Sequence, residues 1–480
     1  MSEHCGFIVK INKLEPHPNA DRLQIAEFFG NSVIVDLNTK IGDMGIFFPV
    51  DLQLSEEYCA QNDLVRRKDA DGNPAGGYLD PQKRNIRALK LRGAKSEGLF
   101  MPIGSLDYIF GKLHAENMLV IGDKIDVLDG HEICCKYIPK SNNVTKVKTS
   151  NHTHKHTAPI APLFAEHADT EQLAYNLDAF KPGDQIEISL KIHGTSGRTG
   201  YLPVLKGYKR SLLDRIFRKE GKPIYDWGYV TGTRRVVLNN FDGGFYGSNE
   251  FREPHAKFFE GKLWRGETVY YEIAGFTTNG QPIMPAVSND KVQDKNFRKQ
   301  YGPTTIFSYG CEPDSKGTVF NCIENGKFYA DVVKPKQSVC YVYRMTLTTE
   351  EGYVVEYTPD YMRYRCEQMG VKCVPVLWKG YIPSPVPSTF DFCDNDFVEK
   401  ERSAGEYIKE IAERYYDGPD PIGKTHVREG VVVRIINRPK FCAYKHKNFS
   451  FKVLEGIAKD IADAPDMEEA QEEIKNENKN

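Results

Sequence analysis

Short runs of apolar and β-branched residues, separated by polar turn residues, cover much of the chain, and this pattern predicts strands. In the first fifty residues, runs at 6–11, 32–35 and 46–50 are divided by turn signals such as Pro16, Pro18 and Asn19. Several short strands at this spacing predict a small β-barrel. We therefore expect the chain to begin with a β-rich domain.

Further strands are predicted in the second half of the chain, together with one clear helix. The period of the apolar residues over 360–369 predicts a helix that packs on a sheet. The predicted strands lie at 187–191, 229–236, 268–275, 340–346, 431–436 and 444–452. Strands combined with flanking helices indicate an α+β fold.

At 480 residues the chain is too long for one ordinary core, so two or three domains are expected. From about residue 136 the composition shifts to Pro, Ser, Asn, Thr and His, which predicts a flexible linker. We interpret the chain as a β-rich domain at 1–135, a linker at 136–163, a larger domain at 164–458 and an acidic tail at 459–480. The linker contains His152, His154 and His156, but no carboxylate or cysteine accompanies them, so we favour a solvated tract over a metal site.

Composition excludes some classes of protein and leaves others open. The 64 basic and 66 acidic side chains nearly cancel, so net charge does not indicate a nucleic-acid partner. The 11 cysteines form no C-x-x-C pair, which argues against a disulfide framework and favours a reducing cytoplasm. No apolar run is long enough to cross a bilayer, so we expect no membrane partner.

Positive charge does gather locally at 83–95, a stretch without any acid. It holds six basic residues: Lys83, Arg84, Arg87, Lys90, Arg92 and Lys95. Such a stretch is either a solvated strand edge or a stripe that contacts phosphates, and we favour the second.

The most informative position is Lys191, where a β-prone run ends and a polar turn with Gly194 follows. A lysine becomes a nucleophile when burial or nearby cations lower its pKa. The alternative is a surface lysine before a tight turn, which is the commoner meaning of a bare Lys-x-x-Gly.

Other ionisable residues stand at or inside predicted strands. Glu272 lies within an aromatic strand, where an unpaired carboxylate would be costly to bury. Glu429 precedes a glycine that opens an apolar strand, and Lys445 and Lys447 share one face of the next. Two aligned ammoniums on one strand favour an anion between them, such as a polyphosphate.

Several of these segments resemble motifs of the ATP-dependent RNA ligases, which belong to the covalent nucleotidyltransferases. The run Lys-Ile-His-Gly-Thr-Ser at 191–196 resembles motif I, in which the lysine carries AMP as a phosphoramide. The strands around Glu272, Glu429 and Lys445-x-Lys447 resemble motifs III, IV and V. Segments 17–23 and 91–99 resemble the OB domain at the N-terminus of one branch of these ligases.

The resemblance implies a fold and a set of functional residues. The expected fold is an N-terminal OB-type β-barrel, then a nucleotidyltransferase domain with ATP-grasp-like antiparallel sheets and flanking helices. The expected ligands are ATP, Mg²⁺ or Mn²⁺, and RNA with 3′-OH and 5′-phosphate ends, bound by a cytoplasmic monomer. The implied site residues are Lys191, Glu429, Lys445 and Lys447 for catalysis; Leu190, Ile192, His193, Gly194, Arg198, Arg234, Glu272, Tyr343 and Val431 for the nucleotide; Glu272 and Glu429 for metal; and Arg84, Arg87 and Arg92 for RNA.

The resemblance also implies three reaction steps: AMP transfer to Lys191, AMP transfer to an RNA 5′-phosphate, and sealing by a 3′-OH. The chain departs from some ligases of this kind at Ser196, where they carry asparagine, and at Leu190, where they carry an acid. ATP rather than GTP therefore rests on the family alone. Arg198, Arg210, Arg234 and Arg235 compete for the role of the arginine that contacts the nucleotide, and Tyr343 is either the ring that stacks on adenine or a core tyrosine.

Two alternatives remain at this stage. A DNA ligase or a capping guanylyltransferase shares Lys-x-x-Gly and Lys-x-Lys, but those enzymes usually carry the OB domain after the nucleotidyltransferase domain. A non-catalytic RNA-binding protein would not need Lys191, Glu272, Glu429, Lys445 and Lys447 together. Covalent labelling with ATP or GTP distinguishes these possibilities.

Overall fold

The computed structural model describes residues 4–50, 52–67, 76–137, 158–168, 170–210, 221–234, 236–238, 241, 250–278, 280, 282–292, 294–310, 323–324, 327–328, 337–393, 396–455 and 458–461. The chain folds into two compact units. Unit 1 comprises 1–147, 290–298 and 452–480, and unit 2 comprises 148–289 and 299–451. The three linker histidines, Arg235 and the acidic tail beyond 461 lie outside the described residues.

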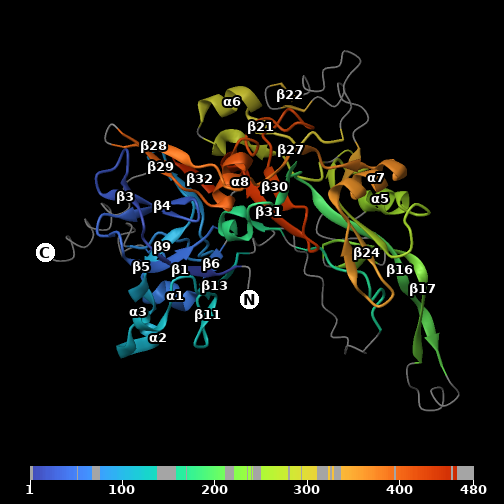
Figure 1. The fold of residues 1–480 in the computed structure, drawn as a ribbon, viewed down its shortest axis with the longest axis horizontal. Helices are drawn as coiled ribbons and strands as arrows, with labels where there is room; N and C mark the ends of the chain where they lie inside the picture. Colours follow the sequence, from blue (N-terminus) through green and yellow to red (C-terminus); the bar gives the residue numbers. More distant parts are fainter. Residues whose placement is uncertain are drawn as a thin grey trace. The chain divides into compact units, whose positions relative to one another are not determined.

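The described part of unit 1 consists of short strands, paired antiparallel except for β32 with β7, and short helices (Figure 1). The main sheet has the order β10 (Lys124–Ile125), β1 (Gly6–Lys10), β5 (Met44–Phe48) and β9 (Leu99–Pro102). Smaller sheets contain β2 (Leu14–Pro16), β3 (Leu23–Phe28) and β4 (Asn31–Asp36); β6 (Leu52–Leu54) and β13 (Cys134–Lys136); β11 (Val127–Leu128) and β12 (His131–Glu132); and β32 (Ala458–Ile461), β7 (Ala88–Leu91) and β8 (Ala94–Ser96). The helices are α1 (Glu56–Gln61), α2 (Asp107–Phe110) and α3 (Ala115–Met118).

The strands predicted near 6–11, 32–35 and 46–50 are confirmed as β1, β4 and β5. Apolar side chains of β1 and β5 form one core, in which Ile8, Ile46 and Phe48 pack with Leu54 and Tyr58. In the described part of unit 1 the strands form separate sheets rather than one closed barrel. The OB-type barrel therefore stays a prediction.

Unit 2 contains two larger sheets. The first, called here the β15 sheet, has the order β14 (Glu171–Gln172), β31 (Cys442–Lys447), β30 (Gly430–Ile435), β15 (Gln185–Leu190) and β27 (Val376–Tyr381). The second, the β16 sheet, has the order β18 (Val237–Leu238), β17 (Lys222–Gly232), β16 (Thr195–Lys209), β19 (Glu267–Gly275), β24 (Ser338–Thr348) and β25 (Val354–Glu356), with β26 (Lys372–Cys373) parallel to β24. Figure 1 shows β16 and β17 as one long hairpin.

Three small hairpins and several helices complete the described elements. The hairpins are β20 (Val287–Ser288) with β21 (Thr304–Thr305), β22 (Ile323–Glu324) with β23 (Lys327–Phe328), and β28 (Thr389–Cys393) with β29 (Asp396–Lys400). The helices are α5 (Glu253–Phe258), α6 (Lys295–Tyr301), α7 (Pro359–Met369), α8 (Ala404–Glu413) and α9 (Phe449–Glu455). None of the helices in the described ranges combines the length and apolar character needed to cross a membrane.

Two helices each cover one sheet of unit 2. The helix predicted at 360–369 is confirmed as α7, which begins at the Thr358 cap with Pro359 at its first turn and ends at Gly370 in the left-handed region. Its Met362 and Cys366 pack on the β16 sheet. Helix α8 starts with a capping box between Ser403 and Glu406, and buries its apolar face on the β15 sheet.

A β-bulge interrupts β24 in the middle of the β16 sheet. Val342 pairs with Tyr271 and Arg344 pairs with Tyr270, so Tyr343 has no partner on β19. Because the extra residue shifts the alternation of side chains, both Val342 and Met345 reach the same core. Simple alternation would have placed these two residues on opposite faces.

The end of the predicted linker is packed against the β16–β17 hairpin rather than free. Ala161 and Phe164 are buried against Leu202 and Val230. The carbonyl of Ile160 also accepts a hydrogen bond of 2.8 Å from the Leu205 amide. Apolar residues at 160–164 give this part of the segment a surface to bury, which the preceding polar residues lack.

Candidate active site

The turn 191–194 connects the two sheets of unit 2. Strand β15 ends at Leu190, and β16 begins at Thr195 in the other sheet. The backbone amide of Lys191 still donates to the carbonyl of Gly430, at 3.0 Å, so the lysine is fixed at the edge of the β15 sheet. Its side chain is about one-quarter exposed, which leaves the amine accessible. The predicted strand-end position of Lys191 is confirmed.

Gly194 brings this turn against β19, where Glu272 lies. A Cβ at Gly194 would lie 2.4 Å from the carbonyl oxygen of Ile273 and 2.9 Å from Cγ of Glu272. Such distances are too short for any side chain, so glycine is required by space. The close packing places Glu272 beside the turn that carries Lys191.

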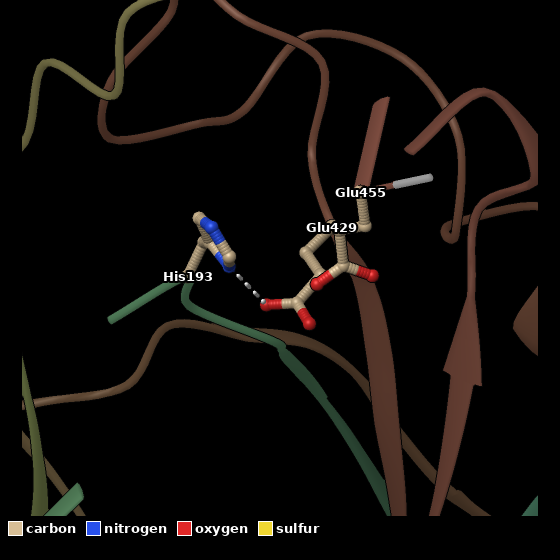
Figure 2. A group of neighbouring side chains, drawn as sticks. All are labelled: His193, Glu429 and Glu455. Carbon is tan, nitrogen blue, oxygen red and sulfur yellow. Dashed lines mark ion pairs between the residues drawn. The ribbon is translucent and has the colours of Figure 1, made fainter. Parts of the chain in front are cut away.

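Glu429 is the centre of the charged cluster. It precedes β30 and is buried, and its Oε1 lies 2.7 Å from Nζ of Lys191 and 3.2 Å from Nζ of Lys447. Its other oxygen, Oε2, lies 3.5 Å from Nδ1 of His193, the ion pair drawn in Figure 2. Two lysines and a histidine from two segments of the chain, the turn 191–194 and β31, therefore meet at one carboxylate.

The two glutamates have opposite electrostatic environments. Burial alone would raise the pKa of Glu429, but the charges of Lys191 and Lys447 hold that pKa well below its usual value. Within the part of the chain that the structure describes, Glu272 has no comparable ion pair, and burial raises its pKa from 4.5 to about 7. The negative charge of Glu429 adds to this rise, while Lys191 opposes it.

The residues present fit a hard divalent cation. Oε2 of Glu429 is buried, and apart from the 3.5 Å ion pair with His193 it has no hydrogen bond within the described residues. A second carboxylate, that of the half-buried Glu272, is close enough to interact with it electrostatically. Carboxylate oxygens are the ligands that Mg²⁺ and Mn²⁺ prefer. A divalent cation would also relieve the repulsion between the two carboxylates.

Strand β31 presents Lys445 and Lys447 on the same face, as the alternation predicts. Lys447 pairs with Gly430 and Lys445 with Val432, so both lie beside the start of β30. Lys447 reaches Glu429. Lys445 lies two residues earlier on the same face of β31.

Three residues implied for the nucleotide are buried apolar side chains. Val431 lies in the core between the β15 sheet and α8. Leu190 and Ile192, on either side of Lys191, are also buried. Because side chains alternate along a strand, Leu190 points away from the face that carries Lys191. The contribution of these three residues to nucleotide binding stays a prediction.

Arg198 is fully buried in unit 2 and donates to backbone carbonyls. Its Nε donates to the Thr233 carbonyl at 3.0 Å, and its NH1 donates to the carbonyls of Phe164 and Ala165. Its guanidinium also lies 4.2 Å from the Phe164 ring centroid. These contacts occupy much of the guanidinium, so Arg198 ties the segment before β15 to the β16 sheet.

Arg234 is exposed and interacts electrostatically with both Glu272 and Tyr343. Among the described arginines that competed for this role, Arg234 combines an exposed side chain with proximity to Glu272. Arg210 is exposed at the far end of β16, and Arg235 lies outside the described residues.

Tyr343 is the bulged residue of β24. Its ring lies 5.4 Å from that of His167, centroid to centroid, and its hydroxyl is buried without a hydrogen-bond partner among the described residues. Burial, together with the charge of Glu272, raises its pKa well above the usual value. The bulge therefore directs an aromatic ring to the neighbourhood of Glu272.

The three arginines implied for RNA lie in unit 1. Arg84 donates its Nε to the Leu54 carbonyl at 3.2 Å, and Arg92 occupies the β7–β8 turn with a positive φ of 45°. Arg87 is half-buried just before β7. The segments 17–23 and 91–99 lie against each other, since Nδ2 of Asn19 donates to the Arg92 carbonyl at 2.7 Å.

One buried residue of this site was missed by the sequence analysis. NH1 of Arg252 donates to the Ser196 carbonyl at 2.9 Å, and NH2 donates to Oγ1 of Thr195 at 2.5 Å. The charge of Arg252 also acts on Glu272. A single arginine before a short helix carries no sequence signal that would have revealed this role.

Comparison with known proteins finds likeness at the level of structure. No family model and no curated protein matches the sequence. Solved structures of Naegleria gruberi RNA ligase do match: a mutant with AMP and Mn at a TM-score of 0.51, and the enzyme with pyrophosphate at a TM-score of 0.50. In both cases the identity is 16%, and the match covers 94% of this chain and 98% of the other.

The likeness establishes the fold. An apo mutant of the same Naegleria ligase matches with a TM-score of 0.51 over 95% of this chain and 99% of the other. The chain therefore has the RNA ligase fold along nearly its whole length, in agreement with the fold implied by its motifs.

Proposed function

We propose that this protein is an ATP-dependent RNA ligase that joins a 3′-OH end to a 5′-phosphate end. The observation that carries the proposal is the Lys191 amine, accessible at the end of β15 and 2.7 Å from the buried carboxylate of Glu429. Lys447 and His193 meet the same carboxylate. This cluster stands in a fold shared with RNA ligases that have been solved with AMP, Mn and pyrophosphate.

In the first step, Nζ of Lys191 loses its proton and attacks the α-phosphorus of ATP. A nitrogen–phosphorus bond forms, the bond to the bridging oxygen breaks, and pyrophosphate leaves, so that Lys191 holds AMP. Lys447, and Lys445 two residues earlier on the same face of β31, supply positive charge for the phosphates. Catalysis of this kind depends mainly on position and charge, which a buried cluster on strand ends provides.

In the second step, a 5′-phosphate oxygen of the RNA attacks the same phosphorus, the nitrogen–phosphorus bond breaks and the Lys191 amine is restored. In the third step, the 3′-OH attacks the 5′-phosphorus of the RNA, a phosphodiester forms and AMP leaves. Glu429 and Glu272 would hold a divalent cation, which when bound neutralises charge on the phosphates.

The nucleoside of ATP is assigned to the face of the β16 sheet that carries Glu272. Glu272 would contact the ribose, Arg234 the phosphates or ribose, and Tyr343 would stack on adenine. The support for these roles is that Arg234 and Tyr343 both interact electrostatically with Glu272. Leu190, Ile192, Gly194 and Val431 would shape the pocket walls.

Unit 1 is assigned to RNA as an OB-type domain, with Arg84, Arg87 and Arg92 as phosphate contacts. The support is that the two segments resembling OB-fused ligases, 17–23 and 91–99, lie against each other. We further propose that the enzyme acts as a monomer in the cytoplasm, consistent with the free thiols of the eight cysteines that the structure describes.

The test is covalent labelling. The protein is incubated with Mg²⁺ and either ATP or GTP labelled at the α-phosphate, and denatured protein is examined for label. We expect one AMP per chain in an acid-labile, alkali-stable bond and none from GTP. Labelled protein is then given a nicked duplex with an RNA 3′-OH strand, which we expect to be sealed. Label from GTP alone would indicate a guanylyltransferase, and no label at all would remove the enzyme from this class.

A further inference from the structure

A buried segment that no sequence motif covers lies between the two loops that form the charged cluster. It follows β21 and contains Phe307, Ser308 and Tyr309, all of which are buried. On one side of it is the turn 191–194. On the other side is the loop 420–426, which leads to Glu429. The segment contacts both.

The Tyr309 hydroxyl makes the connection. It donates to Oδ2 of Asp420 at 2.6 Å, and Phe307, two residues earlier in the same segment, packs against the His193 ring. Tyr309 is completely buried, and this burial together with the charge of Asp420 raises its pKa well above the usual value. The hydroxyl therefore keeps its proton and can donate and accept at the same time.

Asp420 is itself held in place. Its Oδ1 accepts from the backbone amides of Ile422 and Gly423, at 2.8 and 2.9 Å. Its own amide donates to the carbonyl of His426 at 2.9 Å, which closes the loop 420–426. Ser308, next to Tyr309, donates to the Gly423 carbonyl at 2.8 Å. Two neighbouring residues of the buried segment thus fix one loop that leads to Glu429.

The rings of the same segment enclose the His193 side chain. The Phe307 centroid lies 4.4 Å from that of His193 and 5.2 Å from that of His426. The His426 ring is 5.0 Å from that of Tyr309 and leaves no room for a side chain at Gly423, where a Cβ would lie 2.2 Å from Nε2. With its ring packed between Phe307 and Phe451, His193 has a fixed orientation toward Glu429.

We propose that Tyr309 and Asp420 are positioning residues that set the geometry between Lys191 and Glu429 for the transfer of AMP to the lysine. The inference rests on the proposed function. Asp420 holds the loop that leads to Glu429, and its bond to Tyr309 fixes the segment whose Phe307 packs on the turn that carries Lys191. Neither residue touches the amine. Their effect is to join both loops through one hydrogen-bonded pair.

The physical reason is the sensitivity of the displacement to alignment. A shift of about 1 Å in a reacting group lowers a rate by about a hundredfold. Without the Tyr309 hydroxyl, the Asp420 carboxylate would lose a buried partner, and the segment that packs on the turn 191–194 would no longer be bonded through this pair to the loop 420–426.

The experiment compares Tyr309→Phe and Asp420→Asn with Tyr341→Phe in the full chain. Tyr341 is a matched control because it is buried nearby, with its centroid 6.5 Å from that of Tyr309, and no hydrogen bond of its hydroxyl is recorded within the described ranges. Three quantities are measured: the single-turnover rate of AMP transfer at several ATP concentrations, the rate of sealing a nick that already carries the 5′-AMP, and the deuterium exchange of the peptide containing 191–195.

We expect Tyr309→Phe to slow AMP transfer by about tenfold to a hundredfold, with the half-saturating ATP concentration changed by less than about threefold. Sealing of the adenylylated nick, in which the Lys191 amine is not a reactant, should fall much less. Exchange at 191–195 should rise. Asp420→Asn keeps an acceptor oxygen, so its rate of AMP transfer should lie between the rates of Tyr309→Phe and the wild type. Tyr341→Phe should transfer AMP at the wild-type rate.

Equal AMP transfer in Tyr309→Phe and the wild type would overturn the inference. So would equal losses in both steps accompanied by a lowered melting temperature, because that result indicates a purely structural tyrosine. Failure of the proposed function is separable, since the wild type itself would then take no AMP. In that case, unchanged exchange at 191–195 in Tyr309→Phe would still overturn the tie between Tyr309 and the turn.

Discussion

Gly194 and Glu272 are in direct contact: a Cβ on the glycine would approach Cγ of the glutamate to 2.9 Å. Gly194 follows the lysine strand of one sheet, and Glu272 lies in the middle of a strand of the other sheet. The contact therefore brings residues from both sheets to one place. A substitution at Gly194 should separate them.

We expect Gly194→Ala to destabilise the protein by about 1–3 kcal/mol, because the added methyl group overlaps the backbone of Ile273. AMP transfer should fall by a larger factor than stability alone explains, since the turn carrying Lys191 must move. The measurements are denaturant unfolding and labelling. Gly104→Ala is the control, because the nearest atom to a Cβ there is 3.5 Å away. Wild-type labelling in Gly194→Ala would contradict the role of this contact.

Replacement of the nucleophile is expected to abolish labelling without loss of the fold. Lys191→Ala should take no AMP and should stay folded, with stability lowered by about 1–3 kcal/mol because the buried Glu429 loses one of its two ammonium partners. Lys379→Ala, on β27 of the same sheet, serves as the control and should label normally. Label that persists in Lys191→Ala would show that another residue carries AMP.

The charges that meet at Glu429 are expected to be essential for AMP transfer. Glu429→Ala and Lys447→Ala should each reduce the rate by about a hundredfold or more, because both act on charge at the reacting phosphate. Glu429→Ala also leaves the ammoniums of Lys191 and Lys447 facing each other. Chelation of divalent cations should stop labelling in the wild type. Single-turnover rates with and without chelator test these points, and a metal-independent wild type would falsify the cation assignment.

The raised pKa of Glu272 predicts a pH-dependent stability. Because its folded pKa is about 7 against an ordinary 4.5, the folded state holds a proton that the unfolded state has lost between these pH values. Stability from this group is therefore complete below about pH 4.5 and declines as pH rises toward 7. The loss approaches about 3 kcal/mol above pH 7.

Glu272→Gln removes this ionisation, so its stability relative to the wild type should improve between pH 5 and pH 8. The improvement should be of the order of 3 kcal/mol. Urea unfolding of both proteins in metal-free buffer measures the difference at each pH. A difference that does not change with pH would mean that Glu272 titrates normally in the folded protein.

Phosphate contacts by unit 1 would appear in the salt dependence of RNA binding. Arg87→Ala should lower the slope of log affinity against log salt by about 0.7–0.9, because one phosphate contact is lost. AMP transfer from ATP should be unchanged. Lys13→Ala, an exposed lysine of unit 1, is the control and should keep the wild-type slope. An unaltered slope in Arg87→Ala would remove this arginine from the RNA surface.

Much of the site was predictable because its motifs are local. The lysine at the end of β15, the glutamate before β30 and the paired lysines of β31 each follow from a strand pattern and a turn signal. The family resemblance predicted that these segments form one site. The distances from Glu429 to Lys191 and Lys447 give the geometry of that site.

The remaining parts depend on contacts that the sequence does not encode locally. Arg198 was expected at the nucleotide, but its neighbours in sequence do not reveal that the Phe164 and Ala165 carbonyls would occupy its guanidinium. Arg252 and Phe307 lie far along the chain from the turn that they contact. A closed barrel in unit 1 depends on pairing between its first and last strands, which alternation alone does not specify.

The bulge at Tyr343 adds a residue that the pairing of β24 does not need. Val342 and Arg344 already pair with Tyr271 and Tyr270, which are neighbours on β19, so deletion of Tyr343 would restore regular pairing. Val342 and Met345 would then stand two positions apart, and both would keep their places in the core. The deletion should therefore leave the strand intact and remove only the ring that the bulge directs to the neighbourhood of Glu272.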